Sequence, residues 1–242
     1  MRADMLLVEK HLAQSRQKAK ELIETGAVTA DGIIVKKASQ TIKSSAQITI
    51  NSPLQNWVSR GALKLLGGLE AFPQISVQDK VCVDLGASTG GFTQVLLAKG
   101  AKHIFAVDVG HGQLSDKIAK SPRVTSLEKC NARYVTSAEL PTPFQLIVCD
   151  VSFISLTLAL PAAMALAAQG AQMIALIKPQ FEVGREGLDK GGIVKDGALR
   201  DKVVTDISQF IREAGWQVMG VTTSPITGPD GNIEYLVAAT KV

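Results

Sequence analysis

Alternating apolar and polar stretches divide most of the chain into short strands and helices. Continuous apolar runs are typical of strands buried on both faces of a sheet, and they predict strands near residues 81–85, 103–108, 124–127, 145–150 and 171–177. Apolar residues at helical spacing predict helices near 90–99, 156–169 and 198–214, with a weaker one near 112–120. Strands that alternate with helices indicate a doubly wound, parallel α/β sheet.

The end of the chain departs from this alternation. Two strand-like runs, Trp216 to Thr223 and Ile233 to Lys241, are joined by the short segment SPITGPDGN. Such a segment is too short for a helical crossover, so we expect the two runs to pair as an antiparallel hairpin. The sequence therefore predicts a Rossmann-like, seven-stranded sheet with an antiparallel C-terminal strand.

The first part of the chain predicts a smaller α+β module. Helices are expected from Asp4 and from Ser15, because both residue types cap helices well. Apolar runs on both sides of the Asp31-Gly32 turn predict a β-hairpin. A polar stretch with a proline then precedes a helix that begins at Ser59. We therefore predict two domains, at residues 1–57 and 58–242.

Charge is distributed unevenly between these two parts. The chain has 242 residues, and its whole formal excess of four positive charges lies within residues 1–60. This excess favours a module that binds a polyanion, although a solvated helical face explains it equally well. The candidate phosphate-binding residues are Arg2, Arg16, Lys18, Lys20, Lys36 and Lys37.

Composition excludes several classes of protein. A hydrophobic content of 46% with 20% charged residues indicates a globular core rather than disorder. The three scattered cysteines form no disulfide framework and, with three histidines, no zinc-binding spacing. The most apolar stretch, 157–177, is interrupted by Pro161 and Gly170, which argues against a membrane span. We therefore expect a cytoplasmic protein with no metal and no stable membrane association.

The clearest local motif is DLGASTGGF, where a predicted strand gives way to a helix. Gly86 permits a tight turn, and Gly90 and Gly91 permit close approach of the backbone to a ligand. Ser88 replaces the second glycine of a dinucleotide fingerprint and would crowd a pyrophosphate. Asp84 at the end of the strand is also poorly placed beside phosphate charge, which favours a cationic ligand without phosphate. Asp108 ends the next strand and is placed to accept hydrogen bonds from a ribose. A glycine turn without a ligand is the alternative.

Four dispersed charged residues form a second candidate site. Asp150 and Lys178 follow the fourth and fifth predicted strands, at the carboxyl ends where open α/β sheets bind ligands. A lysine directly after a strongly apolar run is costly to bury without a partner. Lys64 and Glu234 taken singly fit ordinary ion pairs. Together with the glycine loop, the four residues favour one site.

These motifs, in this order, resemble the TlyA (haemolysin A) family of ribosomal RNA 2′-O-methyltransferases over essentially the whole chain. Residues 1–35 resemble the RNA-binding module first seen in ribosomal protein S4. The segments WVSRGALKL, DLGASTGGFT, AVDVG, CDVSFIS, IKPQFE and NIEYL resemble successive motifs of the FtsJ-like methyltransferase fold. The resemblance implies S-adenosylmethionine as the cofactor and ribosomal RNA or ribosomal subunits as the substrate.

The resemblance also assigns site residues. The Lys-Asp-Lys-Glu tetrad of 2′-O-methyltransferases falls on Lys64, Asp150, Lys178 and Glu234. The implied cofactor-binding residues are Asp84, Gly86, Ser88, Gly90, Gly91, Phe92, Asp108 and Asn131. Asn131 stands where FtsJ-like relatives often carry an acid. The implied reaction is in-line attack of a ribose 2′-oxygen on a sulfonium methyl group, without a metal.

Three other functions fit the sequence less well. A non-catalytic RNA-binding or ribosome-assembly factor with a vestigial cofactor fold is disfavoured by the intact tetrad. A membrane-active haemolysin, suggested by the old family name, has no candidate span or strongly cationic amphipathic helix to support it. An NAD-dependent enzyme is disfavoured by Ser88 and by the closing hairpin.

Overall fold

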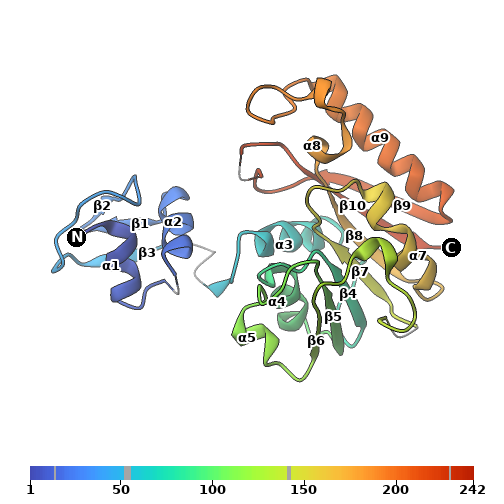
Figure 1. Cartoon of the computed structure of the whole chain (residues 1–242), viewed down its shortest axis with the longest axis horizontal. Helices are drawn as coiled ribbons and strands as arrows, with labels where there is room; N and C mark the ends of the chain where they lie inside the picture. The colour runs from blue at the N-terminus through green and yellow to red at the C-terminus, as the bar shows by residue number, and fades with distance from the viewer. Residues whose placement is uncertain (14, 52–55, 141–142, 229) are drawn as a thin grey trace. The chain divides into compact units, whose positions relative to one another are not determined.

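The computed structural model describes the whole chain except residues 14, 52–55, 141–142 and 229. It divides into two compact units, Met1–Arg60 and Gly61–Val242, each with a sheet of its own (Figure 1). Most of the predicted interdomain stretch, 51–57, lies outside the described residues.

The N-terminal unit packs two helices, α1 (Ala3–Glu9) and α2 (Arg16–Glu24), beside a small antiparallel sheet. The sheet has the order β2-β1-β3, formed by β1 (Val28–Ala30), β2 (Ile33–Ile34) and β3 (Ile48–Ile50). Buried side chains of both helices and of β1 form the unit's core: Leu6, Leu7, Leu22, Ile23 and Val28.

The two predicted helix caps of this unit have different outcomes. Ser15 caps α2, since its Oγ accepts a hydrogen bond from the Lys18 backbone N–H at 3.1 Å. The prediction for Asp4 was wrong, because α1 begins at Ala3, and Arg2, two residues before Asp4, occupies the cap position. The Asp4 carboxylate instead binds the guanidinium groups of Arg2 and Arg16.

The larger unit is built on a seven-stranded sheet with the order β6-β5-β4-β7-β8-β10-β9. Strands β4 to β8 are parallel, β10 is antiparallel to both of its neighbours, and β9 and β10 form the closing hairpin, as predicted. The strands are β4 (Val81–Leu85), β5 (His103–Val107), β6 (Val124–Leu127), β7 (Leu146–Cys149), β8 (Gln172–Ile177), β9 (Trp216–Thr223) and β10 (Tyr235–Lys241).

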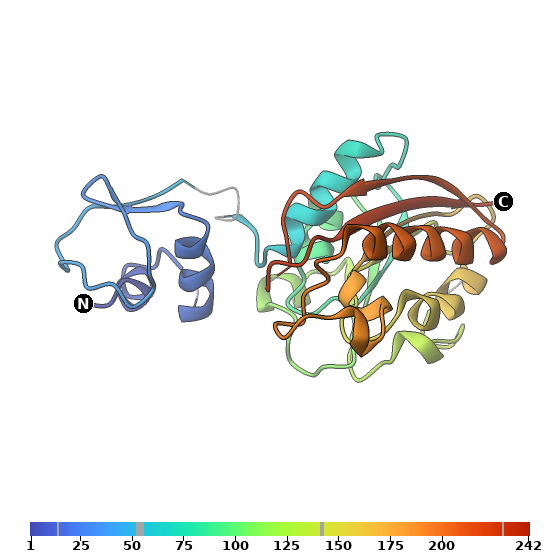
Figure 2. The ribbon, with the colours of Figure 1, turned by 90° about the horizontal axis from the view of Figure 1, so that it is seen from above.

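Helices cover both faces of this sheet. Figure 2 shows α3 (Gly61–Ala71) and α9 (Gly197–Glu213) on opposite sides of the closing hairpin. Helix α4 (Gly91–Ala98) packs beside α3, whereas α6 (Leu156–Ala159) packs beside α9. The remaining short helices are α5 (Asp116–Ala119), α7 (Pro161–Leu166), α8 (Pro179–Glu182) and the 3₁₀ helices η2 (Ala132–Tyr134) and η3 (Arg185–Gly187).

One predicted helix is divided in the structure. The expected helix at 156–169 forms two short helices, α6 and α7, which meet at Leu160. Pro161 is the first residue of α7, because a proline lacks the N–H that would continue α6 but fits the start of a new helix.

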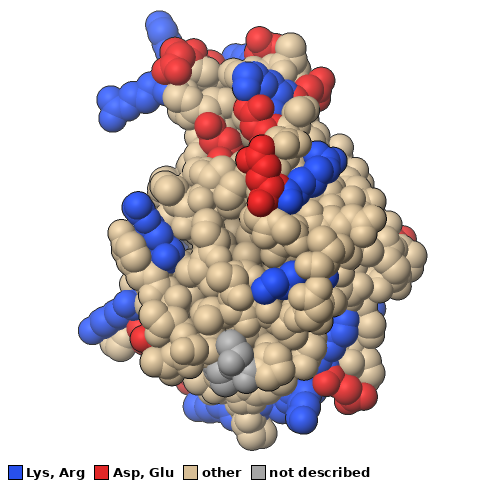
Figure 3. Space-filling model, turned by 90° about the vertical axis from the view of Figure 1, so that its right-hand side faces the viewer, with Lys and Arg blue, Asp and Glu red and all other residues tan. Residues whose placement is uncertain are grey.

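The segment that contains α6 and α7 carries no charged residue between Leu156 and Gly170. On the side of the molecule drawn in Figure 3, charged side chains gather mainly at the top and the lower edge, around a surface that is mostly uncharged. No helix among the described residues is long and apolar enough to cross a membrane.

Candidate active site

The ends of three strands and one helix bring the predicted tetrad to one edge of the sheet. Parallel pairing aligns Leu85 with Cys149, and Cys149 with Ala175, so the carboxyl ends of β4, β7 and β8 lie side by side. Antiparallel pairing aligns Ile177 of β8 with Tyr235 of β10. Lys178 follows Ile177 and Glu234 precedes Tyr235, so this register places the two residues opposite each other.

Lys178 and Asp150 form the first of two ion pairs at this edge. The Lys178 Nζ lies 2.6 Å from Asp150 Oδ1 and donates a hydrogen bond to Ser152 Oγ at 2.8 Å. Lys178 is only 8% exposed, so its ammonium group is fixed by these neighbours rather than by water. The positive charge of Lys178, which is costly to bury at the end of the apolar strand β8, is therefore balanced by the Asp150 carboxylate.

Lys64 and Glu234 form the second pair. The Lys64 Nζ donates to Glu234 Oε2 at 2.5 Å, and both residues are buried. Lys64 comes from α3, which lies tightly against β8 and β10: a Cβ added at Gly68 would lie 3.2 Å from Ile174 Cγ2. The structure thus joins the four tetrad residues in two ion pairs, of which Lys64–Glu234 is buried and Lys178–Asp150 is partly buried.

The glycine loop after β4 is shaped by its close neighbours. Gly86 has a φ of +83°, and a Cβ at this position would lie 2.8 Å from the carbonyl oxygen of Asp150. Glycine therefore lets this loop pass the loop that carries Asp150. Gly90 has a φ of +95°, but the space beside it is filled by the Leu114 and Ile118 side chains. Gly91 begins α4 and, like Phe92, is buried.

Asp84 is a buried carboxylate with one free oxygen. Its Oδ2 accepts a hydrogen bond from Thr93 Oγ1 at 2.5 Å, whereas its buried Oδ1 has no hydrogen-bond partner among the described residues. Burial of the carboxyl group, together with the negative charges of Asp150 and Asp108, raises the pKa of Asp84 to about 7. An unpaired buried oxygen of this kind fits a cationic group of a ligand.

Asp108 orders the neighbouring backbone. Its Oδ2 accepts from the Ser88 N–H at 2.8 Å, and its Oδ1 accepts from the Gly110 N–H at 2.7 Å. Asp108, Ser88 and Gly110 line a small pocket between the glycine loop and the ends of β5 and β6, together with Gln113 and Glu128. The carboxylates of Asp108 and Glu128 supply hydrogen-bond acceptors for ligand hydroxyl groups there.

Asn131 does not line this pocket. It is exposed, and its Oδ1 accepts from the Arg133 backbone N–H at 3.0 Å, so that it caps the 3₁₀ helix η2. The structure therefore gives Asn131 a local capping contact, and the backbone N–H of its neighbour Cys130 donates to the Asp108 carbonyl oxygen at 2.9 Å.

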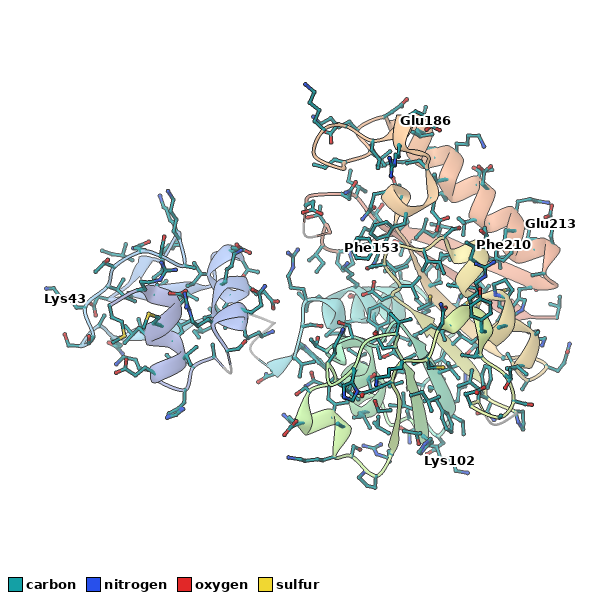
Figure 4. The ribbon with its side chains drawn as sticks, in the orientation of Figure 1. Lys43, Lys102, Phe153, Glu186, Phe210 and Glu213 are labelled. Atoms are coloured by element: carbon teal, nitrogen blue, oxygen red, sulfur yellow. The ribbon has the colours of Figure 1, made fainter. Side chains whose placement is uncertain are left out.

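The loop that follows β7 contributes residues that sequence reasoning missed. Phe153, which is labelled in Figure 4, is 91% exposed with a φ of +64°. Its ring centroid lies 5.1 Å from that of Phe181. Glu182 accepts hydrogen bonds from Ser155 Oγ at 2.5 Å and from the Leu156 N–H at 2.9 Å, which ties α8 to the start of α6. The available signal was an aromatic residue within CDVSFIS, directly after the tetrad aspartate.

Most of the predicted basic residues meet in one cleft of the N-terminal unit. We call this the basic cleft; it is lined by Arg2, Arg16, Lys20, Lys36 and Lys37, together with Asp4 and Glu24. Lys18 lies outside it. The Lys18 Nζ is buried 3.7 Å from Glu21 Oε2, and this burial lowers the pKa of Lys18.

Sheet order and the closing hairpin define the class of the larger unit, which has the fold of S-adenosylmethionine-dependent methyltransferases. A solved structure described as a "putative S-adenosylmethionine dependent methyltransferase" from Listeria monocytogenes, 16% identical, matches it with a TM-score of 0.56 over 74% of this chain and 100% of its own. The FtsJ-like methyltransferase family matches residues 57–241, and the S4 domain matches residues 1–48. This chain therefore belongs to the FtsJ-like methyltransferase family and carries an N-terminal S4 domain.

Individual relatives share both parts of the chain. The 16S/23S rRNA (cytidine-2′-O)-methyltransferase TlyA of Mycobacterium tuberculosis is 45% identical over 98% of this chain and 88% of its own length. Hemolysin A of Brachyspira hyodysenteriae is 40% identical over 98% of both chains. A solved structure described as a "putative hemolysin" from Streptococcus thermophilus is 39% identical, with a TM-score of 0.79 over 100% of this chain and 88% of its own.

Proposed function

We propose that this protein transfers a methyl group from S-adenosylmethionine to a ribose 2′-hydroxyl of ribosomal RNA. The observation that carries the proposal is that two lysine–carboxylate pairs, Lys178–Asp150 and the buried Lys64–Glu234, lie at the sheet edge beside the glycine loop. The relative from M. tuberculosis is named as a methyltransferase of this kind, which supports the same chemistry here. Ribosomal RNA as the substrate implies a cytoplasmic location.

Lys178 is the proposed contact with the reacting oxygen. A ribose hydroxyl is a weak nucleophile at neutral pH and must be aligned while it loses its proton. The Lys178 ammonium group has three N–H bonds, of which one is donated to Ser152 Oγ, while its charge is paired with Asp150 Oδ1 at 2.6 Å. A further N–H remains for the 2′-oxygen, where the positive charge lowers the effective pKa of the hydroxyl and stabilises the negative charge that develops during attack. The hydroxyl proton passes to solvent water as the oxygen–methyl bond forms and the bond from the methyl to sulfur breaks.

The residues around Asp84 fit the cofactor. When bound, S-adenosylmethionine supplies a methyl group that its sulfonium charge has already activated. The free, buried Oδ1 of Asp84 suits a cationic group, and the acceptors on Asp108 and Glu128 suit ribose hydroxyls. We propose that these three residues hold the cofactor, with Ser88 and Gly86 shaping the loop beside it.

Phe153 supports an RNA substrate at the same edge. An exposed aromatic ring near the proposed catalytic lysine offers a face on which a nucleobase can stack. Its left-handed backbone, unusual for a bulky residue, is consistent with a constraint at a functional site. We propose that Phe153 contacts the base of the target nucleotide.

Cofactor affinity is expected to increase with pH because of Asp84. The pKa of about 7 lies above the ordinary value of 3.8, so the folded chain keeps a proton that the unfolded chain has lost. Asp84 therefore lowers the stability of the fold as pH rises from about 4 to about 7. A bound cation favours the ionised form, so Asp84 should strengthen cofactor binding about tenfold between about pH 6 and about pH 8, with proton release.

Calorimetry in two buffers of different ionisation enthalpy measures the cofactor affinity and the number of protons released on binding. The Asp84→Asn variant should lose this contribution, and the difference between parent and variant separates Asp84 from the cofactor's own amino group. The exposed Asp116→Asn provides a matched control. Identical pH profiles for the parent and Asp84→Asn would exclude Asp84 as the residue that titrates.

Methyl transfer itself is tested with tritiated S-adenosylmethionine and purified ribosomal subunits or their naked RNA. The proposed function predicts RNA-bound label with the parent protein and none after heat denaturation. Absence of label on every substrate, with RNA binding intact, would favour the non-catalytic assembly factor instead.

A further inference from the structure

A buried carboxylate lies at the base of the basic cleft. Asp4 is 4% exposed, and its Oδ1 accepts a hydrogen bond from Arg2 Nε at 3.0 Å. Its Oδ2 accepts from Arg2 Nη2 at 3.1 Å and from Arg16 Nε and Nη2 at 3.2 and 2.9 Å. One acid on α1 therefore holds two guanidinium groups, from residues that precede α1 and begin α2.

These contacts leave both arginines able to bind a ligand. Each guanidinium group has five N–H bonds, of which Asp4 takes two. The Arg2 and Arg16 side chains are 45% and 62% exposed. Their remaining N–H groups are thus available at a cleft that they line themselves.

The backbone around Asp4 also fixes the opposite wall of the cleft. The Asp4 N–H donates to the Ala38 carbonyl at 3.0 Å, and the Ala3 N–H donates to that of Gln40 at 2.8 Å. This holds the loop that carries Lys36 and Lys37 against the start of α1. The cleft has a volume of about 630 Å³, within the usual range for ligand clefts.

We propose that Asp4 is a positioning residue for RNA binding, which orients the guanidinium groups of Arg2 and Arg16 for bidentate contacts with backbone phosphates. The inference rests on the proposed function, because it takes RNA as the ligand. A free arginine side chain loses considerable rotamer entropy when it binds a phosphate, whereas one already held in place loses less. Bidentate guanidinium–phosphate contacts depend on such orientation.

The direction in which RNA affinity changes when Asp4 is replaced distinguishes this proposal from simple electrostatics. Asp4→Asn removes a negative charge from a basic surface, so charge alone predicts tighter RNA binding. Loss of the two guanidinium contacts predicts weaker binding instead. The two flanking arginines hold the pKa of Asp4 well below its usual range, so the charged form is the one that acts at neutral pH.

The test uses the full chain and a fluorescein-labelled RNA hairpin, with affinity measured by anisotropy over a range of KCl concentrations. Asp4→Asn should bind about tenfold more weakly than the parent. Glu9→Gln makes the same change in charge on the same helix, at an exposed residue outside the cleft, and should bind as tightly as the parent or slightly more tightly. Equal or tighter binding by Asp4→Asn would overturn the proposal.

A second variant keeps the proposal testable if Asp4→Asn does not fold. Arg16→Lys retains the positive charge but loses the planar guanidinium group and its bidentate contacts. It should therefore also bind RNA about tenfold more weakly, while its circular dichroism spectrum stays unchanged. Parent-like affinity of this variant would contradict the proposal. If the parent protein itself bound no RNA, the proposed function would fail first, so the two failures are distinguishable.

Discussion

Replacing Lys178 with alanine is expected to lower the rate of methyl transfer by about 10³-fold and to leave cofactor affinity unchanged. The reason is that its ammonium group, which pairs with Asp150 and donates to Ser152, is the proposed contact with the ribose oxygen. The rate is measured by single-turnover transfer of tritiated methyl to ribosomal RNA, and cofactor affinity by calorimetry.

Lys202→Ala is the matched control. Lys202 lies on α9 with an exposed side chain, and its Nζ pairs with Asp206 Oδ2 at 2.6 Å, so the control also removes an amine from a lysine–aspartate pair. It should have parental activity. Substantial turnover by Lys178→Ala would refute the assigned role, whereas an equal loss of cofactor affinity would place Lys178 in the cofactor site instead.

Replacing Arg2, Lys36 and Lys37 together with glutamine is expected to weaken RNA binding by about 10²-fold at low salt. All three residues line the basic cleft. Each phosphate contact releases counterions, so the slope of log affinity against log salt should fall by about two to three, at roughly 0.7–0.9 per contact. Anisotropy titrations of a labelled RNA hairpin over a range of KCl concentrations measure both effects.

The control removes the same charge from the larger unit. Lys99, Lys102 and Lys117 are exposed and lie outside the basic cleft, so their triple glutamine variant should change affinity only slightly. Equal losses in the two triple variants would show that RNA responds to net charge alone, and the docking assignment to the N-terminal unit would be wrong.

Strand positions could be predicted from the sequence because burial on both faces leaves a simple pattern. The apolar run of β8 ends at the charged Lys178, and this boundary locates the edge of the sheet. The hairpin of β9 and β10 followed from its short connection. The break at Pro161 was visible in the sequence, but helical spacing on both sides of it predicted one continuous helix.

Contacts between distant residues could not be predicted in the same way. Aspartate is a residue type that commonly caps helices, so Asp4 was predicted to be a cap. Its contact with Arg16, twelve positions later in the chain, forms only when the unit folds. The contact of Ser152 with Lys178, and of Glu182 with the start of α6, likewise depends on how two loops meet at the sheet edge. Residue type at a strand end indicates a site, whereas the partner of each side chain is fixed by packing.

The position of the transferred methyl group tests the central claim most directly. Ribosomal RNA labelled by the parent protein is digested to nucleosides, and the label is assigned to the ribose or to the base. The paired lysines and carboxylates predict label in a 2′-O-methylated nucleoside, together with a neighbouring phosphodiester bond that resists alkaline hydrolysis. Label on a base carbon or an exocyclic amine would contradict the account.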